Sequence, residues 1–568
     1  MKRHRSLCQT LIILVWAAYC LLGADGAASH NGETGTQPKA GLEAQVEHLK
    51  AQIELQQKQL DAMRVTLQEQ QKLLEELRPK PASLGEVASA VPMVPTGPET
   101  ASARPAALYP PEPAPQQVAP PKPAPAKPEQ VDYPLQFHIG DATIMPVGFM
   151  DFTNTFRSTN SGATLATNFG SIPYNNTVGG RLTENKMSIQ NSRIGFRVDA
   201  NVHDWHVIGY FEGDFVGGIG NAAFNTQVTS NSVIFRDRLY WAQLRNGPVE
   251  VLAGQSWSMM TPNRNHISPL PADLFYGQQY DVNYLNGLTW GRIPGIRFVY
   301  HHPSDKFTAG IALENSTQYF GGSGGEGLPT LPSALSNLTS TELDANVVNG
   351  IALPNVHPDI IAKIAWDPSS RGHLEIAGVE STFKTFNPNT QQYFTKAGGG
   401  GSINGNLEVV RGVRLFTNNF WSAGDGRYMF GLAPDFIVRA DGSISLVHSG
   451  STVDGVEATV KNNVFFVYYG GVYVKKNTAR DLNGSLIGYG FAGSPNSENR
   501  TTQEATAGVV QTIWRNPRFG AVQMFWQYAY FFRNPWSVAP GAPRNAHQSA
   551  VWFDLRYTLP GSAPPITR

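Results

Sequence analysis

The sequence predicts an all-β fold, a 16-stranded antiparallel transmembrane β-barrel, preceded by an N-terminal coiled-coil helix and a Pro-rich linker. Three observations lead to this prediction. Apolar and polar residues alternate along the strands, short polar turns alternate with long loops, and no apolar run of about 18 residues follows the first 30 positions. The composition agrees, with 56 glycines, 11% aromatic and 15% charged residues among 568. The net charge of zero argues against nucleic-acid binding.

Residues 1–28 have the pattern of a secretory signal peptide. A basic start at Lys2–Arg5 precedes the apolar run Leu11–Leu22, and the small residues Gly26–Ala28 offer a cleavage site. The apolar run is short for a spanning helix, so a membrane anchor is the weaker interpretation. Both cysteines, Cys8 and Cys20, lie in this segment, and we expect no disulfide in the mature chain.

After a short linker at 29–41, residues 42–78 have the heptad spacing of a coiled coil. Eleven core positions follow at intervals of four and three residues, and only Gln56 and Gln70 among them are polar. So narrow an apolar stripe predicts self-association, and a single amphipathic helix packed on its own domain is the alternative. Residues 79–134 contain 16 prolines. We expect them to form an extended, semi-rigid periplasmic linker.

Residues 135–560 have the pattern of one continuous series of strands, followed by a tail at 561–568. Seven short turns are expected at His203–Asp204, Asn246–Gly247, Pro303–Lys306, Pro368–Gly372, Ser422–Gly426, Lys461–Asn463 and Asn516–Arg518. Eight longer loops are expected near 158–186, 217–233, 259–286, 315–356, 387–404, 433–452, 476–500 and 534–547. Together they delimit 16 strands with both ends on the short-turn side, as is typical of bacterial outer-membrane barrels.

Strand parity predicts which side chains face lipid and which face the lumen. On Ser192–Val202 every second residue from Ile194 onward is apolar, and the residues between them point to the other face. If the apolar face meets lipid, the same reasoning along the other strands predicts a pore-lining set: Arg193, Arg197, Asp199, Glu212, Asp214, Arg236, Arg238, Arg297, Arg414 and Arg556. Tyr210 and Asp554 have the same parity.

The third long loop, Met259–Tyr284, is the expected constriction element if it folds inward. It carries Arg264, Asp273 and Asp281. Lumen arginines facing loop acids would set an anion preference and a transverse field. The alternative is that lumen charges pair only to hold the barrel interior together.

The segments Ser192–Arg197, Gly209–Phe215 and Leu252–Ser258, within the overall layout, resemble the DcaP-like trimeric porins of Gram-negative outer membranes. The resemblance implies a homotrimer with one pore per subunit and passive uptake of small, often anionic, solutes. One departure lies at the C-terminus. Such barrels usually end on an aromatic residue, whereas here Tyr557 is followed by the tail Pro560–Arg568.

We therefore expect an outer-membrane porin, not an enzyme, through which small hydrophilic solutes diffuse, with small anions such as carboxylates favoured. Expected partners are further copies of the chain, outer-membrane lipid and lipopolysaccharide, and peptidoglycan or a periplasmic protein through the coiled coil. No cofactor or nucleic acid is expected. His301, His302 and Asp305 straddle a short turn without metal-ligand spacing, so no metal is expected either. The alternatives are an envelope tether and, less favoured, an outer-membrane hydrolase.

Overall fold

The computed structural model describes residues 135–160, 165–217, 234–269, 274–278, 284–322, 327–340 and 356–560. The predicted signal peptide, coiled coil, linker and C-terminal tail lie outside the described residues, as do Asp273 and Asp281. Within the described ranges, no helix is long and apolar enough to cross a membrane.

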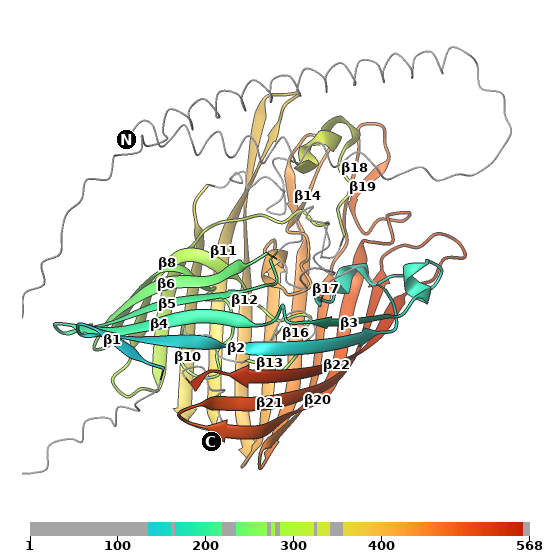
Figure 1. Ribbon diagram of the computed structural model, residues 1–568. Helices are drawn as coiled ribbons and strands as arrows, with labels where there is room; N and C mark the ends of the chain where they lie inside the picture. The colour runs from blue at the N-terminus through green and yellow to red at the C-terminus, as the bar shows by residue number, and fades with distance from the viewer. Residues whose placement is uncertain are drawn as a thin grey trace, which may run out of the picture. The chain divides into compact units, whose positions relative to one another are not determined.

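Antiparallel strands close into a barrel (Figure 1). The main sheet has 18 segments. Of these, β1 pairs with β2 alone, and β3 and β4 pair with successive parts of β2 as two pieces of one strand, so 18 − 2 gives 16 strands in the wall. The segments are β1 (Phe137–Ile139), β2 (Ala142–Arg157), β3 (Glu184–Ser188), β4 (Arg193–Val202), β5 (Trp205–Asp214), β6 (Arg236–Asn246), β7 (Val249–Trp257), β8 (Arg292–His301), β9 (Phe307–Glu314), β10 (Asp359–Ser369), β11 (Gly372–Asn387), β12 (Gln392–Val410), β13 (Val413–Ala423), β16 (His448–Val460), β17 (Asn463–Val474), β20 (Asn499–Asn516), β21 (Gly520–Pro535) and β22 (Ala546–Thr558).

Strand β2 closes the barrel because β22 pairs along one edge and β3 and β4 along the other. Between β3 and β4 the ladder is interrupted, and the Ser192 hydroxyl accepts a hydrogen bond from the Asp151 N–H at 2.9 Å. Closure leaves the wall without an open edge, which a strand structure in lipid requires. Two small sheets lie in the loops, β14 (Phe436–Val438) with β15 (Ile444–Leu446), and β18 (Asn477–Arg480) with β19 (Leu486–Tyr489).

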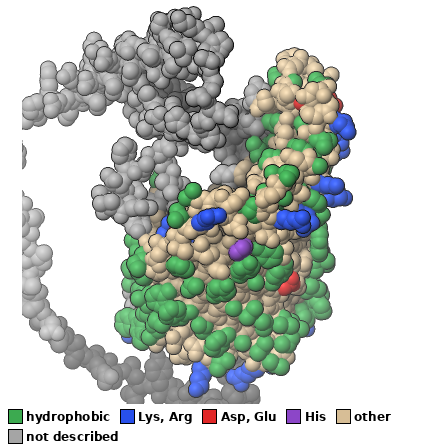
Figure 2. Space-filling model, turned by 90° about the vertical axis from the view of Figure 1, so that its right-hand side faces the viewer, with side chains coloured by type: hydrophobic (Ala, Val, Ile, Leu, Met, Phe, Trp, Pro, Cys, Tyr) green, Lys and Arg blue, Asp and Glu red, His purple; other side chains and the backbone are tan. Residues whose placement is uncertain are grey.

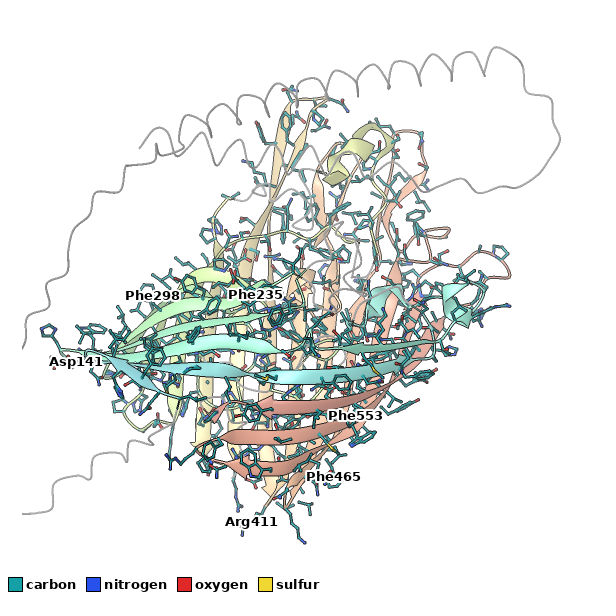
Figure 3. The ribbon with its side chains drawn as sticks, viewed as in Figure 1. Asp141, Phe235, Phe298, Arg411, Phe465 and Phe553 are labelled. Carbon is teal, nitrogen blue, oxygen red and sulfur yellow. The ribbon has the colours of Figure 1, made fainter. Side chains whose placement is uncertain are left out.

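Six of the seven predicted short turns lie between consecutive strands, and one prediction is wrong. The structure places the turn between β12 and β13 at Arg411–Gly412, at the short-turn end of the barrel (Figure 3), whereas Ser422 belongs to β13. The error began with the glycine run 398–401, which suggested a loop but lies within β12. A Cβ at Gly400 would sit 2.6 Å from the Phe420 ring, so glycine makes room for an inward aromatic side chain.

Because 392–404 is strand, the connection between β11 and β12 shrinks to 388–391. These two strands pair with each other beyond the last pairs that β10 and β13 make with them, at Glu380 and Gly399. They therefore form a hairpin that projects past the neighbouring strand ends (Figure 1). Similarly, β16 begins at His448, within the predicted loop 433–452.

Apolar side chains cover the outer wall. On β10, Ile360, Ile364 and Trp366 are exposed, whereas Lys363 between them is buried on the inner face. Phe298 and Phe465 are likewise exposed on the outer wall (Figure 3). Figure 2 shows a band of hydrophobic side chains across the face of the barrel in view, with Lys and Arg above and below it. Such a band, with polar groups turned inward, is the arrangement of a transmembrane barrel.

A basic residue in this band should destabilise the fold. Ile364 is 61% exposed near the middle of β10. We expect Ile364→Arg to lower the free energy of unfolding in a lipid bilayer by about 2–4 kcal/mol, because the guanidinium would enter hydrocarbon. The control is Ser370→Arg in the exposed β10–β11 turn, which should change it by less than about 0.5 kcal/mol. Urea titration of vesicle-reconstituted protein measures both, and equal effects would contradict the placement of the band.

Candidate functional site

The described parts of the loop between β7 and β8, residues 258–291 (loop 3), lie inside the barrel and bind the opposite wall. Arg264 makes a two-pronged ion pair with Glu457 of β16, at 2.8 and 3.0 Å. Further along, the Gln278 N–H donates to the Gln527 side chain of β21 at 2.8 Å, and Arg556 of β22 donates to the Gln278 side chain at 3.0 Å. The predicted inward fold of this loop therefore agrees with the contacts of its described parts.

Loop 3 also reaches the short-turn end of the barrel. The imidazole of His266 lies 3.1 Å from Asp367, near the β10–β11 turn, and 3.7 Å from Asp305 in the β8–β9 turn. The ammonium of Lys363 donates to the Thr261 carbonyl at 2.7 Å and pairs with Glu375 at 2.9 Å. The side chains that hold the loop thus come from inward positions of β10 and β11.

Aromatic packing fills the space between loop 3 and the wall formed by β13–β22. Phe275 contacts Phe416 and Tyr468 edge-on, and Tyr276 stacks on Phe466. Arg264 lies over the Phe416 ring at 4.5 Å. These rings belong to one buried hydrophobic cluster. Loop 3 is therefore held on the wall by apolar packing as well as by hydrogen bonds.

A second loop, 424–447, enters the barrel mouth and pairs with loop 3. Its short 3-10 helix is Gly426–Tyr428. The Trp290 N–H donates to the Tyr428 carbonyl and the Phe430 N–H to the Leu288 carbonyl, both at 2.8 Å. The rings of Trp290 and Phe430 lie 5.3 Å apart. Two loops therefore pair with each other inside the barrel. A long loop near 433–452 was predicted from the sequence, but its pairing with loop 3 was not.

Arg427 fixes the second loop through three carboxylates. It lies 2.5 Å from Asp359 at the start of β10, 3.0 Å from Asp425 and 3.1 Å from Asp435. Tyr428 also donates to Asp359 at 2.8 Å. Burial raises the pKa of Asp425 to about 7, against the opposing effect of Arg427, and burial also raises the pKa of Asp435. The three carboxylates raise the pKa of Arg427 despite its burial.

Five of the predicted pore-lining residues form one ion-pair network on β4–β6. Arg238 lies 2.9 Å from Glu212 and 2.6 Å from Asp214. Arg236 lies 2.6 Å from Asp214, and Arg193 lies 3.6 Å from Glu212. Only Arg236 is appreciably exposed, with 23% of its side chain accessible, whereas the other four are buried. They lie on one face of the sheet, as strand parity predicts. Their pairing is what the alternative expects, in which lumen charges pair only to hold the barrel interior together.

The remaining predicted residues lie apart from this network. Arg197 pairs with Asp199 at 2.6 Å, with 29% and 20% of the side chains exposed. Arg297 is buried 4.0 Å from Glu250, and Arg556 is buried 2.7 Å from Asp151. Arg414 lies 2.5 Å from Asn406 and 3.6 Å from Glu408. Tyr210 donates a hydrogen bond to Glu212, and Asp554 is buried.

The wall carboxylates that bind loop 3 were not predicted from the sequence. Glu457 binds Arg264, and Glu504 accepts the Asn286 N–H at 3.0 Å. At Arg264 a loop arginine therefore pairs with a wall acid, whereas wall arginines facing loop acids were predicted. The sequence signal that could have identified such wall residues is a single charged residue at an inward strand position, as at Glu457 and Lys363. Within the described ranges, no cluster of three or more His, Cys, Asp or Glu could hold a metal ion.

The raised pKa of Asp425 predicts that docking of the second loop weakens as the pH rises. The docked loop holds a proton that an exposed Asp, with a pKa near 3.8, releases above about pH 4. Docking is therefore fully stabilised below pH 4 and loses up to about 1.4 kcal/mol per pH unit until about pH 7. Hydrogen exchange of the loop amides, corrected for intrinsic rates, should show this slope between pH 5 and 7.

Asp425→Asn should reduce the slope, leaving the part that Asp435 contributes, and asparagine tolerates the left-handed backbone there, φ 62°. Asp441→Asn is the matched control in the same loop. Hydrogen bonds from Ser443 lower the pKa of Asp441, so it stays ionised throughout this range and its loss should leave the slope unchanged. Equal slopes in the wild type and Asp425→Asn would contradict the assignment.

Comparison with known proteins gives a structural match without a sequence match. No family model and no curated protein matches the chain. The crystal structure of the outer membrane channel DcaP of Acinetobacter baumannii superposes with a TM-score of 0.52, at 17% identity, over 74% of this chain and 97% of that one. OmpT of Vibrio cholerae (TM-score 0.40, 9% identity, 74% and 99% covered) and Salmonella typhi OmpF with daunomycin (0.37, 12%, 74% and 100%) are less similar. The predicted 16-stranded barrel is confirmed, and the chain has the fold of the DcaP channel.

Proposed function

We propose that the protein is a porin of a Gram-negative outer membrane, in which a water-filled channel lets small hydrophilic solutes diffuse. The observation that carries the proposal is a closed barrel with an apolar outer wall and loop 3 tied across its interior at Arg264–Glu457. A barrel that served only as an anchor would have no use for a loop held across its lumen. The likeness in fold to the DcaP channel supports the same conclusion.

We further propose a homotrimer, held partly by the predicted coiled coil at 42–78. The narrow apolar stripe of that segment needs partner helices. Protein inserted into planar bilayers should therefore show discrete conductance steps that occur in groups of three. A deletion of residues 41–134 should keep the single-channel conductance and loosen the grouping. A sealed bilayer with demonstrably folded protein would contradict the porin proposal.

A preference for small anions such as carboxylates is the finer part of the proposal. Only the accessible arginines can meet a solute directly, and Arg197 and Arg236 are the most exposed of the predicted set. Arg193 and Arg238 act behind them by holding Glu212 and Asp214. Planar guanidinium groups of this kind suit carboxylates.

Replacing both accessible arginines tests the selectivity. In a potassium chloride gradient, Arg197→Ser with Arg236→Ser should shift the reversal potential toward cations, because two positive charges leave the lumen. Arg411→Ser in the β12–β13 turn is the matched control and should shift it much less. Equal shifts, or none, would mean that these two side chains do not govern permeation.

A further inference from the structure

One patch of the outer wall is polar although it lies within the apolar band. It extends over β13, β16, β17 and β20, and we call it the outer polar patch. Its members share an outward strand position and a hydrogen-bonding side chain: Thr417, Asn419, Thr452, Asp454, Tyr469 and Gln503. The wall formed by β8–β10 differs, since its outward side chains include Ile296, Phe298, Ile311 and Ile364.

The members of the patch hydrogen-bond to one another. The hydroxyls of Thr417 and Thr452 each lie 2.7 Å from the Asp454 carboxylate. The Asn419 amide donates to Thr417 at 2.8 Å, and Tyr469 donates to Gln503 at 2.8 Å. These bonds organise the surface but leave a carboxyl group and amide groups pointing outward, which acyl chains cannot solvate. The patch therefore fits a partner with its own donors.

Strand register places the patch below an aromatic row and above an apolar one. Toward the long-loop end, Trp421 and Tyr473 flank Gly450 on adjacent strands. Toward the short-turn end, Leu415 pairs with Val456, which pairs with Val467. Long loops mark the outer side of such barrels, and aromatic girdles mark the level of the lipid headgroups. The patch thus begins at the headgroup level of the outer leaflet.

A depression of about 500 Å³ opens on the outer wall at this height. Two glycines, Gly450 and Gly471, form its floor, and its rim carries Trp421, Tyr473, Gln503 and, at the long-loop end, Lys475. The volume lies in the range of small-ligand sites. The glycines leave a notch because no side chain fills the gap between the aromatic rings.

From these features we propose that the depression binds the headgroup of a phosphorylated glycolipid of the outer leaflet. The order of groups along the wall matches such a lipid. Lys475 meets a phosphate, the aromatic rim meets the sugar faces, and Asn419, Gln503 and Asp454 meet amide and hydroxyl groups at the acyl junction. The apolar row of Leu415, Val456 and Val467 then lies along the acyl chains. The proposal rests on the outer-membrane placement given under the proposed function.

Direct binding tests the proposal with the full-length protein. Detergent-extracted protein freed of glycolipid is titrated with bis-phosphorylated lipid A, and bound molecules per chain are counted by native mass spectrometry. We expect one tight site per chain. Gly471→Leu fills the notch, and its Cβ lies 3.3 Å from the nearest atom, the Thr502 carbonyl oxygen, so the strand needs little adjustment. This variant and Lys475→Gln should each weaken binding at least tenfold.

Gly378→Leu is the matched control, an outward glycine on β11 whose Cβ would meet only the Gly400 carbonyl oxygen, at 3.8 Å. It should bind lipid A as the wild type does. Unchanged binding by Gly471→Leu would overturn the proposal, and so would equal binding of phosphatidylglycerol, which has a phosphate but neither sugar nor amide. Resistance to unfolding in cold detergent verifies that each variant is folded.

A second copy of the chain is the competing occupant. A photo-crosslinking side chain placed at position 471 would then link the chain to a second copy in intact membranes, whichever surface of that copy lies there, and that result would also overturn the proposal. Conductance is recorded on the same preparations. Channels without lipid A binding contradict this inference alone, whereas lipid A binding without channels contradicts only the porin function.

Discussion

The structure depends on one constraint, that every backbone N–H and C=O in a lipid environment needs a partner within the protein. The pairing of β2 with β22 and β4 satisfies it by leaving no edge in the wall. Once the wall is closed, side chains have only two environments. Apolar residues such as Ile364 face outward, and polar residues such as Lys363 face inward. The interior must then satisfy its charged groups with partners of opposite charge.

That second requirement explains why the lumen is so extensively paired. Arg193, Arg236 and Arg238 share Glu212 and Asp214, and Arg427 is surrounded by three acids. A buried charge without a partner would cost several kcal/mol, so inward charges come in complementary groups. In the proposed channel, the same pairing would limit the chemistry that a solute meets, because most of the predicted arginines are engaged and buried. Selectivity would then depend on the few side chains that keep an accessible edge.

The sequence predicted the barrel well because its strands have a strict period of two. Ile194 and Arg193 could be assigned to opposite faces without any tertiary information, and turn residues marked six of seven turns. The prediction failed at the glycine run 398–401, where packing against Phe383 and Phe420 demands glycine inside a strand. Loop partners such as Arg264 and Glu457 could not be predicted, because they are 193 residues apart and meet only through the fold. Which of the predicted pore-lining residues are buried could not be predicted either, because burial depends on tertiary packing.

The projecting hairpin of β11 and β12 exposes strand edges to neighbouring proteins. Its strands beyond Glu380 and Gly399 pair with each other and not with β10 or β13. The Gln318 side chain hydrogen-bonds the Lys384 backbone at 3.4 and 3.5 Å, and the rest of these outer edges has no strand partner among the described residues. Open edges invite strands of other chains to add. Lys384 lies on β11 and Lys396 on β12, so each strand carries a positive charge. The Lys384 ammonium also lies 5.2 Å from the centre of the Tyr393 ring. Cationic edges of this kind let a long surface projection avoid sticking to its neighbours.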